Sequence, residues 1–272
     1  MISQSVGLDS GDRYMKKLLV WDFDNTIARR KGGMWAKTLS EIAEDETGTI
    51  VDPKEFAPFL QIGFPWHDWQ QPHTNIKTAD QWWIELRPLF ESAFERCSLP
   101  GSLASRVREY YADPSKWELV AFAGEVLSSF HEDGYPQVIL SNHVPELENM
   151  VSSLGIGDCF AAIYNSAILG FEKPHPEIFK IVKKSFAETE DIWIIGDSLS
   201  ADIAGGKKAG FNTCWFNPDG KEPGNNGQID VTIYLLSELR TAIGKRLKRC
   251  SSDSDRNRNS PNSQEVPFEE TI

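Results

Sequence analysis

The sequence predicts an α/β fold in which a doubly wound parallel sheet carries an inserted all-helical unit. From residue 117 onward, short apolar runs alternate with segments whose apolar residues recur at helical spacing. The apolar runs are continuous, which is typical of parallel strands that helices cover on both faces. Between residues 32 and 116 helical spacing continues without a strand pattern. We therefore expect a helical insert between the first strand and the rest of the sheet.

The first strand is predicted at residues 17–22, inside the stretch KKLLVWDFDNTIARR (16–30). Its apolar run ends in two carboxylates one residue apart, Asp22 and Asp24. In open parallel sheets, ligands bind beyond the carboxyl ends of the strands. The two carboxylates are therefore expected where the chain meets solvent and ligand.

Three helices are predicted in the insert. The helix in MWAKTLSEIAEDETG is expected to bury Trp35, Leu39, Ile42 and Ala43. The helix in TADQWWIELRPLFESAFERC begins with a capping-box pattern, Thr78 and Gln81, and Pro88 should kink it. Its apolar positions recur every four residues, at Trp82, Leu86, Phe90 and Phe94. The third helix is predicted in GSLASRVREYYADP.

Four further strands are predicted, at residues 137–142, 160–164, 191–197 and 211–216. The helix before them, in WELVAFAGEVLSSFHEDG, should turn one face inward, formed by Val120, Ala123, Leu127 and Phe130. The later helices are expected in VPELENMVSSLG, HPEIFKIVKKSF and SADIAGGKKAG. The sheet unit would thus comprise residues 16–31 and 117–245, and the insert residues 32–116. Residues 1–15 form a polar lead-in, and the polar composition of residues 246–272 predicts disorder.

Bulk composition narrows the classes of function. The chain has 272 residues, a formal net charge of −12, and 40% hydrophobic residues, as expected of a soluble globular protein. The sequence contains no basic stripe with interleaved aromatics, which disfavours nucleic acid as a partner. We see no bilayer-spanning apolar run and no secretory leader, so a cytoplasmic location without a membrane partner is expected. The scattered cysteines form no CxxC pair, and reduced thiols are the simplest interpretation.

Polar residues follow several of the predicted strands, and a parallel sheet can bring them to one edge. Asp22, Asp24 and Asp197 would repel one another at close range and raise one another's pKa values. Mg²⁺ removes that cost and suits an oxygen-only site that stays open to phosphate. Lys173 adds a positive charge and Ser141 a hydroxyl donor. Together these groups form a cradle that suits a phosphoryl group facing a nucleophile.

These residues stand in a known pattern, and the chain resembles the haloacid dehalogenase-like (HAD) hydrolase superfamily. DFDNT matches the first motif of that family, DxDxT. The Ser of ILSN matches the second motif, the Lys of EKPHPEIF the third, and GDSLSAD the GDxxxxD form of the fourth. The order and strand context of the four motifs agree with the family over residues 16–28 and 117–235. The resemblance implies a Rossmann-like core, and the insert sits where the family places a mobile helical cap.

The resemblance also implies catalytic and metal-binding roles. Asp22 would be the nucleophile that forms an aspartyl-phosphate. Asp24 would protonate the leaving alkoxide and then take a proton from the attacking water. Mg²⁺ would be held by the side chains of Asp22 and Asp197 and by the backbone carbonyl of Asp24.

Further roles concern the phosphate and its surroundings. Ser141 and Lys173 would bind phosphoryl oxygens, helped by the backbone amide of Asn142. Thr26, assigned with this phosphate-binding group, would brace the loop that carries the aspartates. Asp202 would orient Lys173 or a metal-bound water. The same residues also have structural interpretations: the acidic pair as a turn or helix cap, Ser141 and Asn142 as turn residues, Lys173 as a solvated loop lysine, and Thr26 and Asp202 as helix caps.

Asp24 distinguishes branches of the family. Dehalogenases of this superfamily lack a carboxylate two positions after the nucleophile, because a departing halide needs no proton, so phosphate ester chemistry is favoured. A phosphonatase would need an insert lysine in an apolar setting, and none of Lys37, Lys54 and Lys77 has one. A phosphomutase or another phosphotransferase shares the core motifs and stays open as an alternative. A non-catalytic regulatory protein is the other alternative, although a binding module does not need three clustered carboxylates.

The insert contains an aromatic segment, GFPWHDWQQPHTNIKTADQWW, with Trp66, Trp69, Trp82 and Trp83 and two histidines, His67 and His73. One interpretation is an aromatic wall over the leaving group, with His67 reaching the active site. The other is packing between short helices, where tryptophan fills much volume. The expected partner is a small phosphorylated substrate, with sugar phosphates, phosphoglycolate, nucleotides and flavin mononucleotide all compatible. The sequence does not indicate an oligomeric state.

Overall fold

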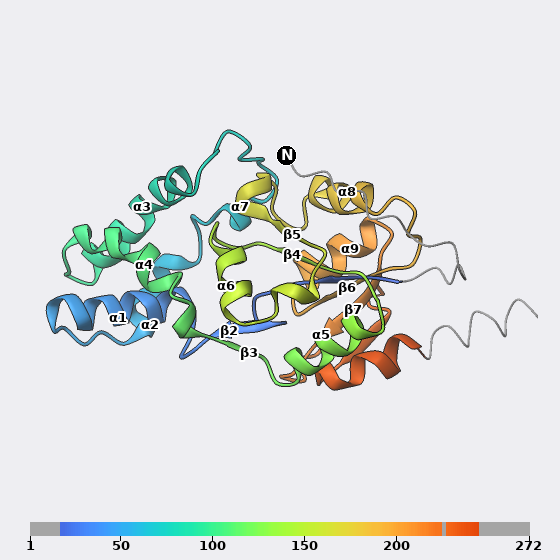
Figure 1. The fold of residues 1–272 in the computed structure, drawn as a ribbon. Helices are drawn as coiled ribbons and strands as arrows, with labels where there is room; N and C mark the ends of the chain where they lie inside the picture. Colours follow the sequence, from blue (N-terminus) through green and yellow to red (C-terminus); the bar gives the residue numbers. More distant parts are fainter. Residues whose placement is uncertain (1–16, 225–226, 245–272) are drawn as a thin grey trace, which may run out of the picture.

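The computed structural model describes residues 17–224 and 227–244, and its centre is a six-stranded parallel sheet (Figure 1). The strand order is β5–β4–β1–β6–β7–β8. The strands are β1 (Leu18–Trp21), β4 (Gln137–Ser141), β5 (Ala162–Asn165), β6 (Ile192–Gly196), β7 (Asn212–Phe216) and β8 (Val231–Ile233). The five predicted strands are confirmed, and β8 is an additional edge strand. The central strand β1 carries the first acidic motif.

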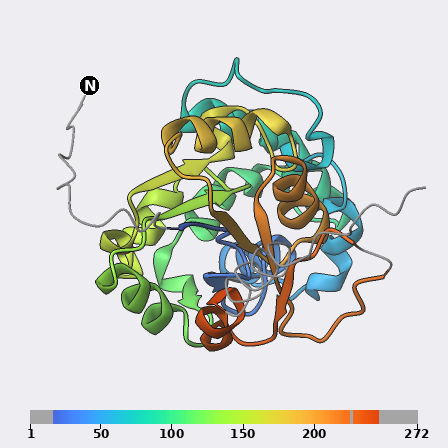
Figure 2. The ribbon, with the colours of Figure 1, turned by 90° about the vertical axis from the view of Figure 1, so that its right-hand side faces the viewer.

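Helices cover both faces of the sheet, as the continuous apolar strands predicted (Figure 2). Leu18 and Val20 face the side of α8 (Pro176–Ser185) and α9 (Gly205–Lys208). Leu19 and Trp21 face the side of α5 (Ala123–Glu132), α6 (Leu147–Ser153) and residues 236–243. All four strand residues are fully buried. The alternation of side chains along β1 therefore divides the apolar core into two layers.

A small antiparallel sheet, β2 (Ala28–Arg30) and β3 (Trp117–Leu119), flanks the helical insert. The prediction of a helix from residue 117 with Val120 on its inner face is wrong at its start. Residues 117–119 form β3, and α5 begins only at Ala123. Phe122, which precedes α5, has a left-handed φ of 67°, so the chain cannot continue as one helix through it. The other three residues of the predicted face, Ala123, Leu127 and Phe130, are buried.

The insert, residues 32–116, consists of helices in the structure. Its α-helices are α1 (Trp35–Thr47), α2 (Pro53–Phe56), α3 (Ala79–Arg96) and α4 (Val107–Tyr111). Its 3₁₀ turns are η1 (Ala57–Leu60), η2 (Pro65–Asp68), η3 (Gly101–Arg106) and η4 (Pro114–Lys116). The apolar stripes predicted for α1 and α3 are buried. Thr78 caps α3 by accepting the amide of Gln81 at 3.1 Å, and α3 continues past Pro88 to Arg96.

The remaining elements lie in the sheet unit. They are η5 (Gly157–Cys159), α7 (Ser166–Leu169), the π-helical turn η6 (Leu199–Ala204) and η7 (Leu236–Glu238). Within the described part of the chain, no helix is both long and apolar enough to cross a membrane. The predicted polar lead-in, residues 1–15, and the predicted tail, residues 246–272, lie outside the described residues.

Two buried or partly buried carboxylates join the insert to the sheet unit. Glu172 lies 2.9 Å from Nε2 of His73, and the amide of His73 donates to the carbonyl of Gly170 at 2.9 Å. Gly170 has a φ of 77°, and a Cβ there would lie 2.7 Å from the backbone of Thr74. At the other contact, Glu146 accepts from the indole of Trp83 at 3.1 Å and from Arg108 at 2.8 Å. The insert is therefore held against the sheet at two separate points.

His73→Ala is expected to lower the free energy of unfolding by about 2 kcal/mol, because it leaves the buried Glu172 carboxylate without its partner. Urea denaturation measures this change. The matched control, His131→Ala, removes an exposed histidine on α5 and should stay within about 0.5 kcal/mol of the wild type. Equal effects of the two substitutions would mean that the His73–Glu172 contact contributes nothing to stability.

Candidate active site

The carboxyl ends of β1, β4 and β6 meet a cavity of about 380 Å³ that the insert closes from the other side. The sheet unit contributes its polar lining, chiefly Asp22, Asp24, Asn142, Lys173, Asp197 and Asp202. The insert contributes an aromatic lining, Trp35, Phe64, Trp66, His67 and Tyr111. A larger hollow of about 720 Å³ along β3 and α5 lacks lysine, arginine and aspartate among its lining residues. Of these two hollows, only the smaller one brings a lysine and aspartates together.

Asp22 follows β1 directly and is held by three side chains. Its Oδ1 accepts from the ammonium of Lys173 at 2.6 Å and from the hydroxyl of Ser141 at 3.3 Å. Its Oδ2 accepts from the hydroxyl of Thr26 at 3.2 Å. Because these donors come from the β1 loop, the end of β4 and the loop before α8, the fold fixes the orientation of this carboxylate. Thr26 is fully buried and braces the β1 loop through Asp22.

Lys173 bridges Asp22 and Asp202. Its Nζ lies 2.6 Å from one oxygen of each carboxylate, and all three side chains are more than nine-tenths buried. Burial alone would lower the pKa of Lys173, but attraction to Asp202 and Asp22 outweighs it and raises the pKa. The predicted contact between Asp202 and Lys173 is confirmed. Gly196 makes it sterically feasible, because a Cβ there would lie 2.3 Å from Oδ2 of Asp202.

Asp24 lies in different surroundings from Asp22. Burial, followed by the charges of Asp22 and Asp197, raises the pKa of Asp24 well above its usual range. Its Oδ1 lies 3.5 Å from Nε2 of His143, and no donor hydrogen-bonds to that oxygen in the described structure. Nδ1 of His143 lies 3.2 Å from the carbonyl of Val144, which leaves Nε2 as the acceptor of the ring. Asp24 therefore suits the protonated, proton-donating member of an acidic pair.

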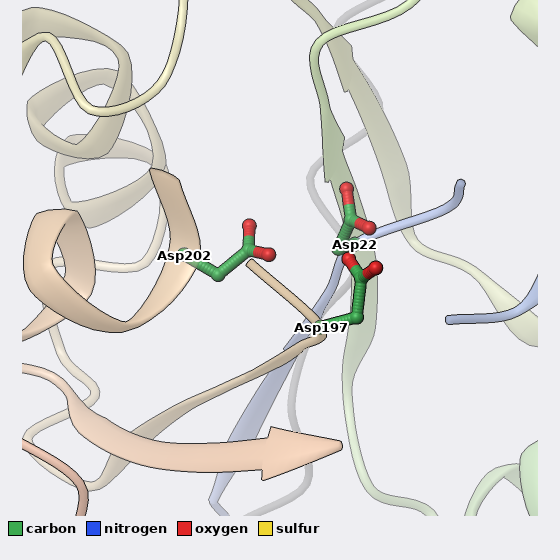
Figure 3. A group of neighbouring side chains, drawn as sticks. All are labelled: Asp22, Asp197 and Asp202. Carbon is green, nitrogen blue, oxygen red and sulfur yellow. The ribbon is translucent and has the colours of Figure 1, made fainter. Parts of the chain in front are cut away.

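The third carboxylate, Asp197, completes an acidic cluster. One oxygen from each of Asp22, Asp197 and Asp202 lies within 4.8 Å of the others. Figure 3 shows the three carboxylates converging from the end of β1, the end of β6 and η6. Burial and the neighbouring Asp22 raise the pKa of Asp197 to about 8. An all-oxygen donor set whose charges repel one another fits a hard divalent cation such as Mg²⁺.

A family comparison agrees with this geometry. Residues 16–210 match the model of the haloacid dehalogenase-like hydrolase family. The chain belongs to this family. Three of the four motifs recognised in the sequence carry Asp22, Lys173 and Asp197 to the cavity of this hydrolase, and the other one places Ser141 in hydrogen-bond contact with Asp22.

Individual relatives of this HAD-like hydrolase extend the similarity over most of the chain. Haloacid dehalogenase-like hydrolase domain-containing protein 3 of Bos taurus is 22% identical over 240 residues, which cover 85% of this chain and 95% of that protein. Glyceraldehyde 3-phosphate phosphatase of Pyrococcus abyssi is 37% identical over 97 residues, 35% of this chain and 40% of that protein. The HAD-hydrolase YfnB of Bacillus subtilis, solved bound to magnesium, has a similar fold, with a TM-score of 0.61, 23% identity and coverage of 82% and 96% of the two chains.

The other predicted site residues are Asn142 and the aromatic segment of the insert, and only part of that segment lines the cavity. Asn142 bonds through its side chain to both the backbone amide and the carbonyl of Lys173, at 2.6 and 2.9 Å, so it positions the lysine loop. Trp66 and His67 line the cavity, whereas Trp69 is not among its lining residues. His73 instead pairs with Glu172. Of the aromatic segment, the part at η2 faces the cavity, and Trp82 and Trp83 are buried between helices.

Several cavity residues were not predicted as site residues, among them His143, Trp35, Phe64 and Tyr111. His143 directly follows the second motif, in LSNH, so its position in sequence was a usable signal. The three aromatics come from α1, the start of η2 and α4. Their meeting depends on tertiary packing, which helical spacing alone does not reveal.

Lys173→Met is expected to lower the free energy of unfolding by about 3 kcal/mol, because it leaves buried carboxylates without a counter-charge. Adding Asp202→Asn to this variant should restore part of the loss by removing one of those charges. Urea denaturation of the two single variants and the double variant gives the coupling between the residues.

The control is Lys180→Met, which breaks an exposed ion pair with Glu177 on α8 and should change stability by less than about 1 kcal/mol. If the double variant were destabilised by the sum of its single substitutions, Lys173 would not act by neutralising Asp202.

Proposed function

We propose that this HAD-like hydrolase is a Mg²⁺-dependent phosphatase that hydrolyses a small phosphorylated metabolite. The observation that carries the proposal is the contrast between Asp22 and Asp24 within one cavity. Asp22 is oriented by Lys173, Ser141 and Thr26, whereas Asp24 is largely buried, has a raised pKa and has no hydrogen-bond donor at its Oδ1. This contrast supports a nucleophile beside a general acid.

In the proposed reaction, an oxygen of Asp22 attacks the phosphorus of the ester. The bond between phosphorus and the ester oxygen breaks, and Asp24 gives its proton to the departing alcohol oxygen. Asp24 then accepts a proton from a water molecule whose oxygen attacks the phosphorus of the aspartyl-phosphate. The bond to Asp22 breaks, which releases inorganic phosphate and restores both carboxyl groups.

The donor set supports Mg²⁺ as the cofactor. Asp22 and Asp197, with the backbone carbonyl of Asp24, would hold the ion, which would neutralise charge on the phosphoryl oxygens. Asp202 is less available as a ligand, because its oxygens accept from Lys173 at 2.6 Å and from the amide of Ser198 at 3.0 Å. Lys173 and Ser141, which donate to Oδ1 of Asp22, would bind phosphoryl oxygens.

Phosphatase chemistry is favoured over dehalogenation, although dehalogenases are among the solved structures with a similar fold. A departing halide needs no proton, whereas an alkoxide does, and Asp24 is placed to supply one. Relatives named as glyceraldehyde 3-phosphate phosphatase and pyrimidine 5′-nucleotidase also support ester hydrolysis. We place the activity in the cytoplasm.

Asp22→Asn is expected to lower kcat for p-nitrophenyl phosphate by about 10³-fold or more, because an amide cannot attack phosphorus. Asp24→Asn should reduce kcat/KM far more on an alkyl phosphate than on p-nitrophenyl phosphate, because p-nitrophenolate departs without a proton. Release of inorganic phosphate and of p-nitrophenol measures both effects.

Asp158→Asn, at an exposed aspartate on η5, is the control and should keep wild-type rates. Equal losses on the two esters would remove Asp24 from the role of general acid. If the wild type with Mg²⁺ released phosphate from no ester, the non-catalytic alternative would replace the phosphatase proposal.

Asp197→Asn should weaken the stabilising effect of the metal. In EDTA the variant is expected to melt at or above the wild-type Tm, because the substitution relieves repulsion with Asp22. Saturating MgCl₂ should raise the wild-type Tm by about 5 °C and the variant Tm by much less, because binding to the folded state stabilises it. Calorimetry with Asp158→Asn as the control measures these shifts, and an equal Mg²⁺ response in all three proteins would exclude Asp197 as a ligand.

A further inference from the structure

We propose that the substrate is a phosphomonoester whose alcohol carries a flat, uncharged ring. This inference rests on the proposed phosphatase function and narrows the substrate class of the same cavity. It depends on two features of the lining, an aromatic surface on the insert side and the distribution of charge around it.

The aromatic surface, formed by Trp35, Phe64, Trp66 and Tyr111, consists of two parallel stacked pairs, and the rings of Trp35 and Phe64 that join them are tilted by 39°. The rings of Trp35 and Tyr111 stack at a centroid distance of 3.7 Å and an interplanar angle of 5°, and those of Phe64 and Trp66 at 4.6 Å and 8°. Trp35 also packs against Phe64 at 4.7 Å, which joins the two pairs. A surface held by such contacts is ordered before a ligand arrives, so binding costs less conformational entropy.

Trp66 is the member of this surface that a ligand can reach most readily. It is half-buried, whereas Trp35, Phe64 and Tyr111 are buried, and it lines the same cavity as Asp22. A flat ring stacked on an indole gains binding free energy beyond that of the apolar area it buries. A puckered ring of the same size buries similar area but cannot make that parallel contact. The aromatic surface therefore favours planar leaving groups.

The charges around the cavity exclude leaving groups with a further negative charge. Lys173 is the single lysine or arginine among the described residues that line the cavity, and its ammonium is already bonded to Asp22 and Asp202. Asp24 and Asp197 add further acidic groups to the same lining. A carboxylate or second phosphate on the leaving group would therefore meet repulsion without a counter-charge.

His67 does not supply the missing positive charge. Its Nδ1 accepts the backbone amide of Phe64 at 3.4 Å, which places the ring hydrogen on Nε2 in the neutral tautomer. Partial burial, which disfavours the charged ring, also lowers the pKa of His67 from its ordinary value. His67 thus offers a neutral N–H to the cavity, which suits an uncharged polar atom on the ring.

The experiment compares kcat/KM for matched esters in the presence of Mg²⁺. Benzyl phosphate and cyclohexylmethyl phosphate both release a primary alcohol and differ in the shape of one six-membered ring. Benzyl phosphate is expected to be favoured by about tenfold, as about 1.4 kcal/mol of stacking would give. 4-Carboxybenzyl phosphate adds a negative charge to the same flat ring and should fall at least about tenfold below benzyl phosphate.

Two variants connect the preference to the aromatic surface. Trp66→Leu should reduce the benzyl to cyclohexylmethyl ratio to below about threefold, because leucine keeps an apolar contact and loses the flat face. Trp69→Leu removes a half-buried tryptophan from the same segment that does not line the cavity, and it should keep the full ratio.

The outcomes separate this inference from the function on which it rests. Hydrolysis of all three esters at similar kcat/KM, or a ratio that Trp66→Leu leaves unchanged, would overturn the substrate class and leave the phosphatase intact. If none of these esters or p-nitrophenyl phosphate were hydrolysed, both proposals would fall.

Discussion

The ammonium of Lys173 between Asp22 and Asp202 is the interaction on which the site depends. Asp22, Asp24 and Asp202 are each buried over more than three-quarters of their side-chain surface, and the charged form of each would destabilise the fold if left unpaired. Lys173 neutralises part of this charge and fixes the direction of Asp22. The acidic cluster that remains, around Asp197, is the part that a divalent cation can complete. Stability and chemistry therefore share the same contacts.

Parallel topology explains why residues so far apart in sequence form this site. Asp22 and Lys173 are 151 positions apart, yet their atoms lie 2.6 Å from each other. β1 lies between β4 and β6 in the sheet, so the chain emerges from three neighbouring strands at one edge. Loops after these strands carry Asp24, Asn142 and Asp197, and the loop before α8 brings Lys173 across them. The strand order thus brings the site residues of the separate motifs together at one edge of the sheet.

The parts that sequence predicts well are those in which local chemistry decides the structure. Continuous apolar runs located the five main strands, and strand-end carboxylates located the polar half of the cavity. β2 and β3 were missed because each has only three residues, and their pairing joins residues 28–30 to residues 117–119 across the insert. The aromatic half was only partly predictable. Trp66 and Trp69 are three positions apart in similar sequence, and tertiary packing alone places the first on the cavity and the second away from it.

The two halves of the cavity are held by different kinds of force, which has a consequence for selectivity. Charge-assisted hydrogen bonds fix the acidic half, whereas ring packing fixes the aromatic half, so a change in Trp66 need not disturb Asp22. The halves are nevertheless coupled through Glu172, which precedes Lys173 and pairs with His73 of the insert. Glu172 is 1% exposed with the insert in place, so moving the insert away would break a buried charge pair beside the lysine loop. The closed arrangement is therefore favoured by the same kind of charge pairing that organises the catalytic half.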